Sequence, residues 1–357
     1  MDFEAERARL GWNADRQAEL ERLGDAALLA ARVVVEHRGS YGLAGSAVKT
    51  ARPAGRLRRE GGAWPAVGDW VAVEPAAGDG VIQHVLARTS LLERKRPGVD
   101  RAQAVAANID IVFAVTSAEH PPNLRRVERT LAMILAGGAR PAVVLNKIDL
   151  AGDADGDLRA LASASGGAPC IGTSAATGAG VQALRALLPP GATGALLGPS
   201  GAGKSSLVNA LLGGDRLATG AVRVSDGKGR HTTTRRELLE LPGGACLIDT
   251  PGMRELGLWD AGDGIDRTFA DLAELAAACR FRDCSHHGEP GCAVAAALDS
   301  GALDAARFAS FEKLRREDAF QERRSDPRSA AATRQRWKAV HKQHRARSRV
   351  DPKLRDD

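Results

Sequence analysis

The sequence contains the run Gly198-Pro199-Ser200-Gly201-Ala202-Gly203-Lys204-Ser205-Ser206, which decides the fold. It fits the pattern G-x-x-x-x-G-K-[ST]. The apolar run Ala195–Leu197 precedes it, and a helix-like run through Leu212 follows. In a strand–loop–helix context, the glycines let backbone N–H groups converge on phosphates at a helix N-terminus. Lys204 would hold the β and γ phosphates, and the Ser205 hydroxyl would bind Mg²⁺. We therefore predict that residues 198–206 bind a nucleotide within a parallel α/β sheet.

A second motif, Asn146-Lys147-Ile148-Asp149, follows the buried-strand run Val143–Leu145. Guanine presents N1–H and N2–H₂ side by side, and one carboxylate can accept both hydrogen bonds. Adenine offers no such pair of donors, so Asp149 would select guanine. Asn146 would brace the loop, and the methylene stem of Lys147 can lie over the base.

Two shorter segments would complete the nucleotide site. Ser174 and Ala175 could add a backbone contact to the guanine O6, although a Ser-Ala pair alone is a poor signal. Asp249 ends the strand-like run Ala245–Ile248 and suits an outer-sphere contact to Mg²⁺. Gly252 can bring a backbone N–H close to the γ-phosphate. Together these spacings favour a GTP site over a chance glycine-rich loop.

A threonine-rich run, Lys228–Thr234, lies between the phosphate loop and Asp249. It resembles a loop that senses the γ-phosphate, because a threonine hydroxyl can complete the Mg²⁺ shell only with the triphosphate bound. Thr233 or Thr234 is expected to supply that hydroxyl, although the spacing does not select one of the three threonines. A threonine-rich hairpin loop without such a role is the alternative. Many GTPases carry a water-orienting glutamine where this chain has Met253. His231 is the nearest candidate for that role, with an exposed loop histidine as the alternative.

The order of the motifs is unusual, because the guanine-selecting motif comes before the phosphate-binding loop. The same sheet can be built when the old chain ends are joined and new ends are cut at an exposed loop. The sequence therefore predicts a circularly permuted GTPase domain. In this order the strand ending at Asp249 leads almost directly into the C-terminal region, so nucleotide state could reposition that region.

Three of the five cysteines cluster with a histidine as Cys279-x₄-Cys284-x-His286-x₅-Cys292. Three thiolates and one imidazole form a complete ligand set for a tetrahedral Zn²⁺ ion. Four protein ligands leave no open position, so we predict a structural site. His287 is the alternative nitrogen ligand.

The composition is that of a soluble globular protein, with 44% hydrophobic and 26% charged residues among 357. This length predicts roughly two or three domains. The charged N-terminus lacks a secretory signal and no apolar run could span a membrane, so we expect a cytoplasmic protein without membrane contact.

The net charge is +6, yet Arg323–Asp357 alone holds twelve Lys/Arg and four Asp/Glu, an excess of eight. This basic tail suggests a polyanionic partner such as nucleic acid, or a solvated, disordered end.

We expect a multidomain chain with four regions. Residues 1–31 form an N-terminal arm, 32–104 an antiparallel β-barrel of about five strands, 105–260 the permuted α/β GTPase domain, and 261–357 a helical zinc-binding domain with the basic tail. Barrel strands are expected at Val33–Val35, Gly55–Leu57, Trp70–Val73 and Val81–Val85. Helices are expected at Leu124–Ala136, Gly301–Arg324 and Ser329–Arg345.

With these motifs the chain resembles the ribosome small-subunit-dependent GTPase A family, circularly permuted GTPases of bacterial ribosome assembly. The matching segments are Gly68–Val73, Asn123–Arg126, Asn146–Asp149, Gly198–Leu207, Gly229–Thr234, Asp249–Gly252 and Cys279–Val294. The resemblance implies an oligonucleotide-binding (OB) barrel, a GTPase domain and a zinc domain. It also implies binding to the small ribosomal subunit and its rRNA in late maturation, with subunit-stimulated hydrolysis of GTP to GDP and phosphate. The ends before Arg32 and beyond Lys342 match no family pattern and receive no role.

The leading hypothesis is thus a monomeric GTPase that uses hydrolysis as a timing switch on an RNA–protein assembly. An alternative is a nucleic-acid-binding module that GTP merely regulates. Intact Lys204, Ser205 and Asp249 favour real turnover, and the cysteine cluster lacks the His-x₃₋₅-His end of a DNA-reading finger. An ATP-using P-loop kinase is disfavoured by the guanine-selecting motif.

Overall fold

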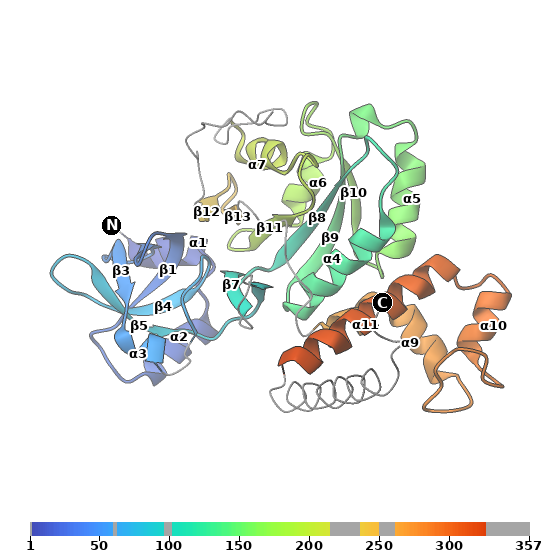
Figure 1. The fold of residues 1–357 in the computed structure, drawn as a ribbon. Coiled ribbons are helices and arrows are strands. Elements are labelled where there is room, and N and C mark those ends of the chain that lie inside the picture. The colour runs from blue at the N-terminus through green and yellow to red at the C-terminus, as the bar shows by residue number, and fades with distance from the viewer. Residues whose placement is uncertain (1, 60–62, 96–101, 215–235, 250–260, 326–357) are drawn as a thin grey trace, which may run out of the picture.

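The computed structural model describes residues 2–59, 63–95, 102–214, 236–249 and 261–325. Figure 1 shows a β-barrel, an α/β sheet with helices on both faces, and a group of C-terminal helices. The barrel and the α/β sheet share one hydrogen-bonded strand order, β10-β9-β8-β11-β13-β12-β1-β2-β3-β5-β4. Each helix within the described residues is too short or too polar to cross a bilayer.

The barrel is closed, because its first strand pairs with both of its outer neighbours. Strand β1 pairs with β2 and β4, β3 pairs with β2 and β5, and β4 pairs with β5. The strands are β1 (Leu29–Glu36), β2 (Tyr41–Ala44), β3 (Thr50–Pro53), β4 (Trp70–Glu74) and β5 (Gly80–Val85). A five-stranded barrel in this region is therefore confirmed, although the pairing of β3 with β5 is parallel and the expectation of a fully antiparallel barrel is wrong on that point. Its centre is filled by small and branched side chains, among them Val33, Val71 and Ile82.

The prediction of one barrel strand is wrong. Residues expected to be extended at Gly55–Leu57 instead form the short helix α3 (Gly55–Arg59). The preceding strand ends at Pro53, and Ala54 N donates to Ile82 O at 2.9 Å, which turns the chain across the barrel. Leu57 then packs against the barrel core.

The N-terminal arm is helical and packed, with α1 (Phe3–Arg9) and α2 (Ala14–Arg22). The two helices begin at Asp2 and Asn13, whose side chains accept hydrogen bonds from backbone N–H groups in the first turn. Between the helices, Trp12 lies edge-on to Trp70 of β4, with ring centroids 4.8 Å apart. The arm is therefore part of the folded structure.

Arg32 of β1 links the arm, the barrel and the α/β sheet. Its side chain is fully buried and donates to Leu10 O in the arm and to Gly68 O at 3.2 Å beside the barrel. It also donates to Asn108 O at 3.3 Å and to Thr193 Oγ1 at 2.8 Å. Burial lowers the pKa of Arg32 to about 10, which still leaves the guanidinium charged at neutral pH.

A two-stranded ribbon, β6 (Leu91–Lys95) with β7 (Ala102–Ala107), leads from the barrel to the α/β sheet. In that sheet five parallel strands lie in the order β10-β9-β8-β11-β13, and β12 runs antiparallel along β13. The strands are β8 (Ile111–Ser117), β9 (Arg140–Asn146), β10 (Cys170–Thr173), β11 (Thr193–Leu197), β12 (Glu237–Glu240) and β13 (Cys246–Asp249).

Helices cover both faces of this sheet. The even residues of β8, such as Val112, join the core beneath α4 (Leu124–Ala136) and α5 (Ala154–Ala164). The odd residues, such as Phe113, join the opposite core beneath α6 (Val181–Ala186) and α7 (Lys204–Leu212). This alternation follows from the period of two in a strand and explains why β8 is apolar on both sides. The expected helix at 124–136 is confirmed by α4.

The α/β sheet continues into the barrel through β12 and β1. Val35 pairs with Glu237 in antiparallel register. Next to that pair, Arg236 Nη1 lies 2.8 Å from Glu36 Oε2, and both side chains are largely buried. Strands that are far apart in the sequence therefore lie side by side.

Within residues 261–325 the C-terminal group consists of the helices α8 (Gly262–Thr268), α9 (Ala270–Ala277), α10 (Ala293–Asp299) and α11 (Ala305–Ser325). Helix α8 approaches α4 so closely that a Cβ on Gly264 would lie 2.1 Å from Ala132 O. Arg307 Nη1 of α11 donates to the buried Glu128 of α4 at 2.9 Å. The expected helix at 301–324 corresponds to α11, whereas the one at 329–345 and most of the basic tail lie outside the described residues.

Candidate functional site

Three of the nucleotide motifs predicted from the sequence, those at Asn146, Gly198 and Asp249, meet at one edge of the α/β sheet. Strands β9, β11 and β13 are parallel, so their carboxyl ends lie together. These ends carry the loop at Asn146, the loop after Leu197 and the side chain of Asp249. The permuted order along the chain therefore still brings the motifs together in space.

The glycines of the loop between β11 and α7 fit where other residues would not. Gly198 has φ of +150°, and a Cβ there would lie 2.1 Å from Val115 O. Gly203 has φ of +83°, and its Cβ would lie 2.2 Å from Asn146 Nδ2. Any larger residue would push this loop away from the neighbouring strand ends.

Lys204 and Ser205 open helix α7 at the loop. Lys204 Nζ donates to Gly198 O at 2.8 Å and to Pro199 O at 2.7 Å, so the ammonium lies inside the curve of the loop. Ser205 and Ser200 are exposed, Ala202 is buried, and Gly201 is in the left-handed region at φ of +82°. Ser206 follows in the first turn of α7. The loop therefore presents backbone N–H groups, one ammonium and one hydroxyl at a helix N-terminus.

Asn146 joins the two central loops. Its side chain is 1% exposed, and Nδ2 donates to Ala202 O at 2.9 Å. Its Oδ1 accepts from Thr173 Oγ1 at 3.1 Å and from Ala175 N at 3.4 Å. Ser174 is fully buried, and its Oγ accepts from Thr177 N at 3.1 Å. One amide thus fixes the relative positions of the phosphate loop and the 173–175 segment.

Lys147 and Asp149 follow Asn146 at the rim of the sheet. Asp149 is exposed within the 3₁₀ helix η1 (Ile148–Leu150). Lys147 has φ of +65° and Nζ lies 2.6 Å from Glu119 Oε2. Hydrogen bonds from Lys147 and Ser117 lower the pKa of Glu119, which is therefore ionised at neutral pH. Nothing in the sequence pointed to Glu119 as a residue of the site, apart from its position just after β8.

Asp249 ends β13 opposite Glu237 of β12. Burial raises the pKa of the Asp249 carboxyl, the charge of Glu237 adds to that effect, and Lys204 opposes it. Asp249 thus lies within electrostatic reach of Lys204. The other candidates predicted from the sequence, Thr233, Thr234, His231 and Gly252, lie outside the described residues, as does Met253.

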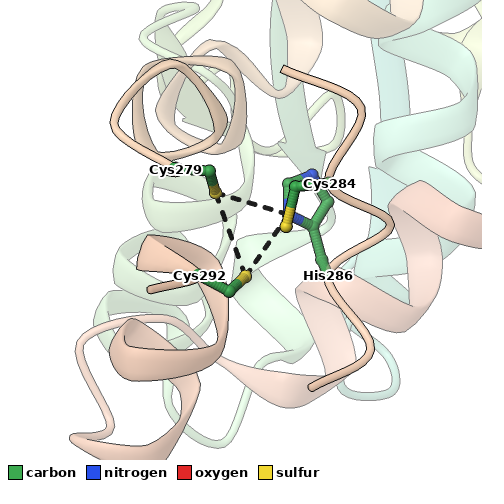
Figure 2. Close-up of side chains that lie close together, drawn as sticks. All are labelled: Cys279, Cys284, His286 and Cys292. Carbon is green, nitrogen blue, oxygen red and sulfur yellow. Dashed lines mark hydrogen bonds between the residues drawn. The ribbon is translucent and has the colours of Figure 1, made fainter. Parts of the chain in front are cut away.

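A separate candidate site lies among the C-terminal helices. Figure 2 shows Cys279, Cys284, His286 and Cys292 pointing toward one another, and their ligand atoms all lie within 4.8 Å of each other. Cys279 follows α9, and Cys292 is the N-cap of α10. The turn between them places His286 in the left-handed region, and Glu289 accepts hydrogen bonds from the backbone N of Ser285 and His287 at 2.9 Å.

The spacing of three of these four ligand atoms suits a tetrahedral metal ion. Cys279 Sγ lies 3.9 Å from Cys292 Sγ, and the two sulfurs lie 3.6 and 3.5 Å from His286 Nδ1. Ligands about 2.0–2.3 Å from a central ion would be about 3.3–3.8 Å apart along the tetrahedron edges. The three cysteines form no disulfide. His287 points elsewhere, with Nε2 3.0 Å from Glu312 Oε1, so the cluster can hold a metal ion with His286 as its nitrogen ligand.

The chain is similar to several known proteins. The family model described as RsgA GTPase matches residues 85–259. The "Small ribosomal subunit biogenesis GTPase RsgA" of Opitutus terrae is 48% identical, with 96% of this chain and 98% of the relative covered. The protein of that name from Streptomyces avermitilis is 43% identical, with 92% and 90% covered. Among solved structures, the crystal structure of YjeQ from Thermotoga maritima has a TM-score of 0.62 and 28% identity, with 80% and 97% covered.

Proposed function

The chain belongs to the RsgA family of GTPases, and from this premise we propose that it acts in late maturation of the small ribosomal subunit. It is a hydrolase that acts on GTP. In the proposed role it binds the subunit and its rRNA, hydrolyses GTP to GDP and phosphate, and is stimulated by the subunit. The name carried by relatives at 48% and 43% identity supports this assignment.

The observation that carries the nucleotide site is the hydrogen bond from Asn146 to Ala202 O. It joins a loop suited to guanine and a loop suited to phosphates at one sheet edge. In the proposed site Asp149 accepts the two guanine donors, the stem of Lys147 covers the base, and Ser174 and Ala175 face the guanine O6.

We assign the phosphate end to the loop of residues 198–206. Lys204 would leave the carbonyls of Gly198 and Pro199 and bind the β and γ phosphates, because a phosphate is a stronger partner than a neutral carbonyl. Ser205 would bind Mg²⁺, with Asp249 in the outer shell. Mg²⁺ supplies charge neutralisation on the phosphates when it is bound.

The switch elements of the proposal are Thr233 or Thr234, which would complete the Mg²⁺ shell, and Gly252, which would contact the γ-phosphate. His231 is the proposed candidate for orienting the attacking water. Met253 cannot orient water, so slow intrinsic turnover and acceleration by the partner are expected.

We propose that Cys279, Cys284, His286 and Cys292 hold one structural Zn²⁺. The closed donor set and the tetrahedral spacing support this choice, and four protein ligands leave no place for a substrate. The ion would fix the turn between α9 and α10.

We propose that the barrel is of the OB type and contributes to rRNA binding. Its support is the closed order β1-β2-β3-β5-β4, with helix α3 between β3 and β4. We retain four regions as proposals: the arm 1–31, the barrel 32–104, the permuted GTPase domain 105–260 and the zinc domain 261–357. The last three residues of the arm, Leu29–Ala31, already belong to barrel strand β1. The ribbon of β6 and β7 spans the second junction. The protein is proposed to act as a cytoplasmic monomer without membrane contact.

The test is GTP hydrolysis by the purified protein, with and without small ribosomal subunits, and with ATP as the control nucleotide. Slow GTP turnover that rises sharply only with small subunits is expected, and Lys204→Ala should abolish both rates. A GTP turnover rate that small subunits do not change would contradict the proposed ribosomal role. Equal use of ATP would remove the guanine assignment.

A further inference from the structure

The side chain of Lys147 is held at its tip by a residue outside the guanine-selecting motif. Lys147 Nζ lies 2.6 Å from Glu119 Oε2. The same carboxylate oxygen accepts a hydrogen bond from Ser117 Oγ at 2.8 Å. Ser117, at the end of β8, thus holds the Glu119 carboxylate in place while that carboxylate binds the Lys147 ammonium.

The backbone fixes the distance between the two residues. Ser117 pairs with Asn146 at the ends of the parallel strands β8 and β9. Immediately beyond, Ala118 N donates to Asn146 O at 2.8 Å. Lys147 is therefore the first residue after β9 and Glu119 the second after β8, two strands that are locked in register, and their side chains meet at the rim.

The stem of Lys147 runs beside the phosphate loop. A Cβ on Gly203 would lie 3.7 Å from Lys147 Cε, an ordinary van der Waals separation. The last methylene of the lysine is thus placed next to the loop, and its ammonium is directed toward Glu119. Lys147 is 27% exposed and Glu119 44% exposed, so this pair lies at the open edge of the proposed guanine site.

We propose that Glu119 is a positioning residue of the guanine site, which orders the Lys147 side chain before the nucleotide binds. A free lysine has many rotamers, and ordering it on binding costs free energy that a preformed ion pair removes in advance. The methylene stem is then already extended where the base packs. This inference rests on the proposed function, because it presumes that a guanine base lies against Lys147.

The test measures affinity for GDP by titration calorimetry in the full chain. Glu119→Ala should weaken GDP and GTP binding by the same factor, roughly two- to five-fold, as for an exposed ion pair. Glu119→Gln should keep part of the affinity, because its amide oxygen can still accept from Lys147 and Ser117.

The double mutant separates positioning from a general structural effect. In a Lys147→Met background, Glu119→Ala should have no further effect, since there is no ammonium to hold. The matched control is Asp79→Ala on the barrel, where a carboxylate likewise holds a cation, Arg52, and a hydroxyl, Thr50. It should leave GDP affinity unchanged.

Two results would overturn the inference alone: unchanged GDP affinity in Glu119→Ala, or an equal loss in the wild-type and Lys147→Met backgrounds. A wild-type protein that binds no guanine nucleotide would instead overturn the proposed function, and this inference with it.

Discussion

The amide Nδ2 of Asn146 donates to the carbonyl oxygen of Ala202 at 2.9 Å, and this bond ties the guanine loop to the phosphate loop. Asn146→Ala should weaken GDP binding by roughly ten-fold, because an unpaired buried acceptor costs about 1–3 kcal/mol. Calorimetric titration with GDP measures the effect. The control is Asn13→Ala, which removes the N-cap of α2 and should lower stability without changing GDP affinity. An unaltered affinity in Asn146→Ala would show that the bond does not organise the site.

The proposed base selection can be inverted at Asp149. Asparagine offers one acceptor and one donor, and xanthine keeps N1–H but replaces the 2-amino donor with an acceptor oxygen. Asp149→Asn should therefore weaken GTP binding on the order of 100-fold or more and bind XTP better than GTP. Competition between labelled GTP and XTP measures the switch. Loss of both nucleotides to the same extent would argue against a direct contact between Asp149 and the base.

Arg32 should be among the most important single residues for stability. Arg32→Met would leave hydrogen-bond acceptors in the arm, beside the barrel and in the α/β sheet without their donor. This should lower the free energy of unfolding by about 3 kcal/mol or more. Urea unfolding measures the change. Arg52→Met is the control, since Arg52 is exposed and forms a surface ion pair with Asp79, and it should cost less than about 1 kcal/mol. Similar urea midpoints for both variants would contradict the role of Arg32 in linking the arm, the barrel and the α/β sheet.

Removal of the metal should unfold the C-terminal helices before the rest of the chain. Cys292→Ser would remove a buried ligand, and one bound Zn²⁺ per chain should fall to none by elemental analysis. Protease digestion should then cut between α9 and α10. Cys170→Ser is the matched control, because Cys170 lies outside the cluster and should leave the metal content unchanged. Full metal content in Cys292→Ser would show that the site is held by other residues.

Local patterns in the sequence predicted those features that depend on local spacing. The strand–loop–helix at Gly198 and the helix α4 follow from glycine placement and from apolar periodicity. The cysteine cluster follows from ligand type alone, although the choice of His286 over His287 required the structure. His286 adopts φ of +65° and turns inward, whereas His287 turns toward Glu312.

Features set by long-range contacts could not be predicted in this way. At Gly55–Leu57 the chain forms a helix in which Leu57 packs against the barrel core, and a weak extended pattern in the sequence carries no information about that packing. Arg32 appears in the sequence as an ordinary strand residue, and only the fold brings Leu10 and Thr193 to it. Glu119 likewise gains its partner from the register of β8 and β9.

The pairing of β12 with β1 has a consequence for any attempt to separate the chain into pieces. A strand at the border of a sheet exposes unpaired N–H and C=O groups and invites pairing with other molecules. Without the barrel, β12 would be such a border, and a shortened protein beginning at β8 would tend to self-associate through it. The barrel therefore also covers this border of the α/β sheet, which should lower the tendency of the sheet to aggregate.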